Sequence, residues 1–191
     1  MERAYIEDKI FEGNNFTTVA LEQGNYDNCR FINCNFAETN LSGINFSDCA
    51  FNDCNLSMAK LGKTGLREVK FTGCKLLGLH FEHCNTIGLA FSFNNCMVNL
   101  SCFYALKLKS TVFKNCVLHE ADFTETDLTG AVFDHCDLKG TLFENTLLEK
   151  ADFSTAFNYS IDPAMNKIKK ARFSMPGVLG LLDKYDIKID V

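Results

Sequence analysis

Ten cysteines and four histidines are the side chains of this 191-residue chain that could ligate a metal ion or act as nucleophiles. The cysteines recur at spacings of five and twenty residues, and the sets that are twenty apart are Cys29 and Cys49; Cys34, Cys54 and Cys74; and Cys96, Cys116 and Cys136. Zinc sites instead use pairs separated by about two to four residues. The cysteine spacing therefore predicts small buried side chains rather than metal ligands.

The remaining polar residues do not form a recognisable catalytic set. The histidines fall at polar positions without a paired spacing, and we assign no metal-binding or catalytic role to any of them: His80, His83, His119 and His135. The sequence contains no nucleophile elbow, no P-loop and no dinucleotide-binding glycine run. We therefore predict that the protein is not an enzyme and has no catalytic residue, metal or cofactor.

A five-residue period of large apolar residues determines where these side chains lie. It runs from Ile6 to Phe81 and resumes from Val98 to Phe153, mostly as Phe and Leu. A period of five matches neither an α-helix nor a flat strand. It predicts a repeat architecture.

Each repeat also has a second apolar position. We call the periodic residue the large position, and the residue two before it, which is mostly Cys, Ala or Thr, the small position. Nine cysteines fall at small positions, and only Cys102 falls outside them. One large and one small inward residue, separated by polar ones, are what a coil of short turns around a narrow core requires. Burial of the thiols in such a core also argues against a redox sensor, because sensor thiols need exposure.

Units such as Ala121-Asp122-Phe123 and Ala151-Asp152-Phe153 resemble the A(D/N)Lxx signature of pentapeptide-repeat proteins, over about residues 4–157. The resemblance implies an all-β fold, a right-handed quadrilateral β-helix with four pentapeptides in each coil. The twenty-residue cysteine spacing agrees with such a coil. About thirty units, stacked about 4.8 Å apart per coil, would give a rod of roughly 36 Å.

We divide the chain into a β-helix over 1–173 and a C-terminal segment over 174–191. The period slips once, because Phe91 and Val98 are seven residues apart, and this predicts a two-residue insertion at about 92–97. The insertion is either a tolerated bulge or a recognition loop. The candidate loop residues are Phe93, Asn94 and Asn95.

The C-terminal segment is predicted to form a short helix over about 174–185 and then a strand in which Ile187, Ile189 and Val191 alternate with polar residues. The helix has little polar face and must be covered. It either seals the last coil or joins two copies, and we predict a homodimer. The candidate interface residues are Met175, Val178, Leu179, Leu181, Leu182, Tyr185, Ile187 and Ile189.

The net charge of −5 argues against direct binding of nucleic acid. The chain begins without a basic-then-apolar leader and has no apolar run long enough to cross a membrane, so we expect a cytoplasmic protein without membrane contact. Residues 119–152 hold nine acids against Lys139 and Lys150. They are either ordinary solvated surface or one acidic face that imitates nucleic acid. The nine acids are Glu120, Asp122, Glu125, Asp127, Asp134, Asp137, Glu144, Glu149 and Asp152.

Among pentapeptide-repeat proteins the chain resembles the Qnr-type quinolone-resistance members. The similarity rests on the phase-shifted repeats, on the unit Cys54-Asn55-Leu56-Ser57-Met58-Ala59 and on the C-terminal segment Leu179–Val191. Qnr-type proteins are dimers joined at their C-termini that occupy the DNA-binding saddle of type II topoisomerases as DNA mimics. The resemblance thus implies binding and protection of DNA gyrase or topoisomerase IV. The alternative is a structural or interaction module with an unrelated partner, and acids scattered over all four faces would favour it.

Overall fold

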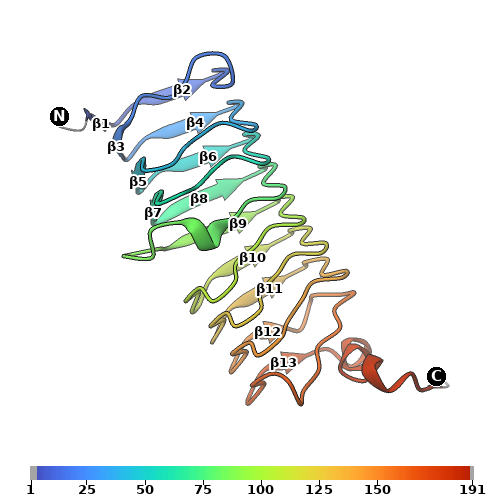
Figure 1. The fold of residues 1–191 in the computed structure, drawn as a ribbon. Helices are drawn as coiled ribbons and strands as arrows, with labels where there is room; N and C mark the ends of the chain where they lie inside the picture. Colours follow the sequence, from blue (N-terminus) through green and yellow to red (C-terminus); the bar gives the residue numbers. More distant parts are fainter. Residues whose placement is uncertain (1–3, 190–191) are drawn as a thin grey trace.

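The computed structural model describes residues 4–189 as a parallel β-solenoid of about eight turns (Figure 1). Nine short strands stack into one sheet, in the spatial order β2 (Ile10–Glu12), β4 (Arg30–Ile32), β6 (Ala50–Asn52), β8 (Val69–Thr72), β9 (Phe91–Asn94), β10 (Val112–Lys114), β11 (Val132–Asp134), β12 (Asp152–Phe153) and β13 (Arg172–Phe173). A second sheet holds β1 (Ala4–Glu7), β3 (Gly24–Asp27), β5 (Asn45–Ser47) and β7 (Gly65–Arg67). The all-β prediction is confirmed.

Each coil has four faces, and each face is one pentapeptide. In one coil the first face is 131–135, which contains β11, the second is 136–140, the third is 141–145 and the fourth is 146–150. The nine-stranded sheet forms the first face and the four-stranded sheet forms the N-terminal half of the fourth. Isolated parallel bridges, such as Val117 to Asp137 on the second face, connect the coils elsewhere. The register between coils is twenty residues, as the cysteine spacing predicts.

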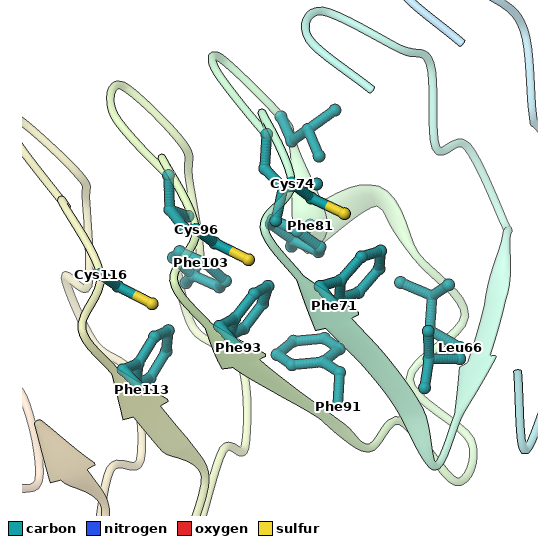
Figure 2. Packing of buried hydrophobic residues seen from close by; sticks show 14 of the residues in the cluster. Leu66, Phe71, Cys74, Phe81, Phe91, Phe93, Cys96, Phe103, Phe113 and Cys116 are labelled. Atoms are coloured by element: carbon teal, nitrogen blue, oxygen red, sulfur yellow. The ribbon is translucent and has the colours of Figure 1, made fainter. Parts of the chain in front are cut away.

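The core contains two columns of aromatic rings that stack along the axis of the solenoid. On the first face Phe113 stacks between Phe93 and Phe133, with ring centroids 5.0 Å apart on both sides. On the third face Phe103 and Phe123 stack in the same way and meet the Phe113 ring edge-on. Figure 2 shows the two columns side by side in the coils around Phe93 and Phe103. Each ring therefore contacts its own column and the neighbouring one.

Thr and Cys side chains at small positions find hydrogen-bond acceptors inside the coil. The Thr126 hydroxyl donates to the Phe103 carbonyl at 2.8 Å, and the Cys136 thiol to the Phe113 carbonyl at 3.4 Å. Both acceptors lie 23 residues earlier, on the preceding coil and adjacent face. Buried hydroxyls and thiols that are paired in this way cost little.

The cysteines form longer columns than the spacing predicts. All ten are free thiols, nine of them are buried, and Cys102 is half-buried, as expected from its position. In Figure 2 Cys74, Cys96 and Cys116 lie in one line. Contacts between the thiols of Cys74 and Cys96 join the two sets of three into a single column of six.

Thiol labelling checks this core. Burial raises the pKa of Cys49 and of Cys84 to about 12, so the reactive thiolate is rare as well as shielded. We expect a disulfide reagent to modify at most one thiol of the native protein quickly, Cys102, and all ten after denaturation. Rapid modification of several thiols in the folded state would contradict the buried columns.

The phase shift lies earlier than predicted. Asn85 bridges to Gly65, twenty residues before it, whereas Phe91 pairs with Val69, twenty-two before it. The two extra residues are therefore 89–90. They follow the corner at Gly88, and Figure 1 shows this green segment beside β9, where it leaves the stack.

The prediction of a loop at Phe93, Asn94 and Asn95 is wrong. Phe93 is 1 % exposed in β9 and occupies the large position, Asn94 ends the strand, and Asn95 is the regular left-handed corner. The period alone placed Phe91 at a large position. Phe91 instead fills the small position two residues earlier and packs against the Phe81 ring.

The C-terminal segment is helical but not α-helical. It forms two 3₁₀ helices, η2 (Pro176–Leu181) and η3 (Asp183–Tyr185). A Cβ at Gly180 would clash with the Tyr159 carbonyl oxygen, so only glycine allows this close approach. The Gly180 carbonyl in turn accepts a hydrogen bond from the Ile161 amide at 2.9 Å, which fixes η2 to the last coils.

The predicted C-terminal strand is absent from residues 186–189, which pair with neither sheet within the described part of the chain. Val191 lies outside the described residues. Within 4–189 no helix has the length and apolar character needed to cross a bilayer.

Candidate interaction surfaces

The nine predicted acids do not share a face. The first face holds Asp134 and Asp152, the second Glu120 and Asp137, the third Asp122, Glu125 and Glu144, and the fourth Asp127 and Glu149. The prediction of a single acidic face over 119–152 is therefore wrong.

Turn chemistry explains the scatter. Asp122, Asp127 and Asp152 precede large positions, and each Oδ1 accepts the amide of the residue two later, at 2.8 to 3.1 Å. This Asx turn closes a corner of the coil on any face. Asn35 and Asn55 do the same without charge. The acids at these positions therefore serve the turns of the repeat, whatever the surface binds.

A basic side chain on a neighbouring coil pairs with at least one acid on each of three faces. On the fourth face Asp127 lies 3.4 Å from Lys109 Nζ, and on the second Asp137 lies 2.8 Å from His119 Nε2. On the first, Asp152 lies 2.9 Å from Arg172 Nη1. Exposed pairs of this kind contribute only about 0–1 kcal/mol each. These pairs therefore matter mainly because they reduce the negative charge of the three faces, and they add little to the free energy of unfolding.

These contacts give the protein a pH dependence. Partial burial raises the pKa of Asp127, Asp137 and Asp152, but hydrogen bonds and the cations outweigh it, so each pKa lies below its ordinary value. A lowered folded-state pKa stabilises the fold above the unfolded pKa, and that stability is lost as pH falls through the folded one. We expect the urea midpoint to fall below about pH 4.

The control for this prediction keeps the turns and removes the charge. Asn supports the Asx turn elsewhere in the chain, so D127N/D152N is expected to fold and to show a weaker loss between about pH 5 and pH 3. Equal midpoints for the unsubstituted protein across that range would contradict the assignment.

The third face differs from the others, because its last five pentapeptides contain no Lys or Arg. They are 79–83, 101–105, 121–125, 141–145 and 161–165. Their acids, which we call the third-face stripe, are Glu82, Asp122, Glu125, Glu144 and Asp162. Asp162 pairs with Lys184 of η3, whereas no described Lys or Arg pairs with the middle three acids. The fourth face of the same coils is basic, with Lys107, Lys109, Lys150, Lys167, Lys169 and Lys170 against Asp127 and Glu149.

Sequence reasoning found three of the five stripe acids. It missed Glu82 and Asp162 because it grouped acids along the chain rather than at the coil spacing. Every fourth pentapeptide lies on the same face of the coil. Assigning each acid to its pentapeptide, and grouping every fourth pentapeptide, would have found the stripe.

The repeats are recognised by family models. A "Pentapeptide repeat region" matches residues 24–92, and "Pentapeptide repeats (8 copies)" matches 101–140 and 126–156. The chain belongs to the pentapeptide-repeat family.

Two solved pentapeptide-repeat structures share the fold. One is a trypsin-treated variant of QnrB1, a plasmid-mediated fluoroquinolone resistance protein, with 16 % identity and a TM-score of 0.69 over 98 % of this chain and 92 % of that one. Another is HetL of Nostoc sp. strain PCC 7120, involved in heterocyst differentiation regulation, with 17 % identity and a TM-score of 0.50 over 91 % and 88 %. No curated protein sequence matches the chain. The two roles differ, so the pentapeptide-repeat fold alone does not select a partner.

The C-terminal end of this pentapeptide-repeat chain is apolar and open. Met175 is 86 % exposed, and none of the η2 side chains is fully buried. The exposed members of the predicted interface are Met175, Val178, Leu179, Tyr185, Ile187 and Ile189. Leu181 instead packs against the core, and Leu182 is half-buried. A groove of about 300 Å³ is lined by four apolar residues, Leu179, Leu182, Ile187 and Ile189, and by Asp183 and Asp186.

Proposed function

We propose that the protein is non-enzymatic and binds the basic DNA-binding surface of a type II topoisomerase, DNA gyrase or topoisomerase IV, through the third-face stripe, imitating DNA. The observation that carries this proposal is the absence of Lys and Arg from five successive pentapeptides of one face. Complementary charge steers such a partner to the face and suppresses wrong orientations.

The charge spacing supports this reading. The five stripe acids span four coil steps, about 19 Å at about 4.8 Å per coil. One strand of DNA carries a phosphate every 3.4 Å, or about six over the same length. The stripe therefore approximates the charge density of one strand. The other three faces do not extend the imitation, because their acids are mixed with cations.

We also propose a homodimer joined through the exposed apolar residues of the C-terminal segment. Such a patch at one end of a rod is typical of an interface between copies. The third-face stripe ends beside this segment, where Asp162 contacts Lys184. Two copies joined there would place two stripes on one longer rod.

The second candidate is an interaction module whose partner is unrelated to topoisomerases. The basic C-terminal half of the fourth face favours it, because a DNA mimic has no use for six lysines beside its acidic face. A partner with both an acidic and a basic surface would match the corner between the third and fourth faces.

Supercoiling by gyrase and decatenation by topoisomerase IV, with and without ciprofloxacin, test the proposal. We expect the protein to inhibit supercoiling or to relieve the drug at micromolar concentration. No effect of a confirmed dimer at tens of micromolar on either enzyme would contradict the topoisomerase proposal and favour the interaction module.

A further inference from the structure

We propose that His80, Glu82, His83 and Cys102 form a binding site for a zinc-type transition-metal ion on the third face. The site shares Glu82 with the third-face stripe, but the argument for it does not rest on the proposed function. Its three ligands from one turn offer a carboxylate oxygen and two imidazole nitrogens that all lie within 4.8 Å of one another.

A local departure from the repeat brings the two histidines together. The corner residues stacked above and below His83 are Lys63 and Ala105, with left-handed φ values of 59° and 55°. His83 instead ends the 3₁₀ helix η1 (Phe81–His83), and its amide donates to the His80 carbonyl at 3.2 Å. Residues three apart eclipse each other in a 3₁₀ turn. The two imidazole rings therefore stack, 5.3 Å apart and 18° from parallel.

The distances fit one ion between the three side chains. His80 Nδ1 lies 2.7 Å from Glu82 Oε1, and His83 Nε2 lies 3.8 Å from the same oxygen. Ligands about 2.05 Å from a tetrahedral zinc are about 3.3 Å apart. The two observed separations bracket that value, so small side-chain rotations suffice for coordination.

Glu82 carries a second, independent sign of a missing partner. Its side chain is 18 % exposed, and among the described residues its buried Oε2 has no hydrogen-bond partner. A buried carboxylate oxygen without a partner is costly. A cation bound by both oxygens of this carboxylate would remove that cost.

We assign the fourth donor to Cys102 on the next coil. Its thiol lies 3.9 Å from Asp122 Oδ2 and outside the cluster of the three ligand atoms, so it must rotate toward the ion to bind. Cys102 is bridged to His80 across the third face, and it is half-buried, whereas the other nine cysteines are buried. Two imidazoles, a carboxylate and a thiolate are donors that zinc accepts in a four-coordinate site. Binding would release the thiol proton to solvent.

Titration of the untagged, full-length protein with Zn²⁺ against a chromophoric chelator tests the site. We expect one equivalent to bind at micromolar affinity or tighter. The variant H80N/H83N should bind at least about 100-fold more weakly, since even outer-shell partners of a metal cost up to that factor. H119N/H135N removes two other surface histidines and is the matched control, expected to bind within about twofold of the unsubstituted protein.

Cobalt absorption tests the fourth ligand. Co²⁺ bound by the unsubstituted protein should show a thiolate charge-transfer band that is missing from C102S, with circular dichroism confirming that each variant is folded. A band that persists in C102S would overturn the role of Cys102. Equal affinities of H80N/H83N and H119N/H135N, or no stoichiometric zinc binding, would overturn the site.

Discussion

Phe113→Ala is expected to lower the free energy of unfolding by about 3–5 kcal/mol, the usual cost of deleting a fully buried Phe side chain. The Phe113 ring is completely buried and stacks on Phe93 and Phe133, while Phe103 and Phe123 meet it edge-on. The coils above and below cannot collapse into the cavity without breaking their ladder. In a solenoid each coil contacts only its neighbours. A cavity in the coil of Phe113 therefore weakens the contact between the N-terminal and C-terminal halves of the stack.

Phe157→Ala is the matched control. Phe157 is the same residue type in a bridge on the second face, but it is 48 % exposed and points outward. We expect it to cost about 1 kcal/mol or less. Urea unfolding at several protein concentrations measures both variants. Similar losses for the two phenylalanines would contradict the distinction between large positions and outward positions.

The double variant L179D/I187D is expected to convert a dimer into a folded monomer. Both side chains line the C-terminal groove, and Ile187 is 56 % exposed. A carboxylate buried without a partner in an apolar interface costs several kcal/mol, which is a large part of the affinity of a typical dimer. Substitution is cleaner than truncation here, because η2 is hydrogen-bonded to Ile161 and its loss would disturb the last coils.

Ile87→Asp supplies the control, since Ile87 is 72 % exposed and lies just before the insertion at 89–90, four coils before the C-terminal segment. We expect it to leave the mass unchanged by light scattering. A monomeric unsubstituted protein at tens of micromolar, or a dimeric L179D/I187D, would contradict the proposed interface.

The sequence was sufficient for the regular part of the fold. Large and small positions repeat because the coil permits two inward residues in five, so Phe113 and Cys116 could be placed without coordinates. The insertion was misplaced because Phe91 and Phe93 are both large. A period cannot decide which of two alternating inward residues fills the large position. The bridges of Asn85 and Phe91 to different registers decide it.

The interaction surfaces were harder to predict, because charge along the chain is not charge on a face. Asp127 and Asp152 are five pentapeptides apart and lie on neighbouring faces. Each carboxylate closes an Asx turn and pairs with a Lys or Arg of a neighbouring coil. The histidine pair was missed for a different reason. Histidines three residues apart meet only if the corner is a 3₁₀ turn. Nothing in the sequence of the repeat predicts that His83 adopts this turn in place of the left-handed corner conformation.

The most direct test of the account compares binding to gyrase of two variants with equal loss of charge. D122N/E125Q/E144Q neutralises the middle of the third-face stripe and keeps the Asx turn at residue 122, whereas E120Q/D134N/E149Q removes one acid from each of the other faces. Measured at low and at physiological salt, the third-face variant should bind about tenfold or more weakly than the unsubstituted protein, with a reduced salt dependence, and the control within about twofold. Equal weakening by both variants, or none by either, would contradict recognition through the third face.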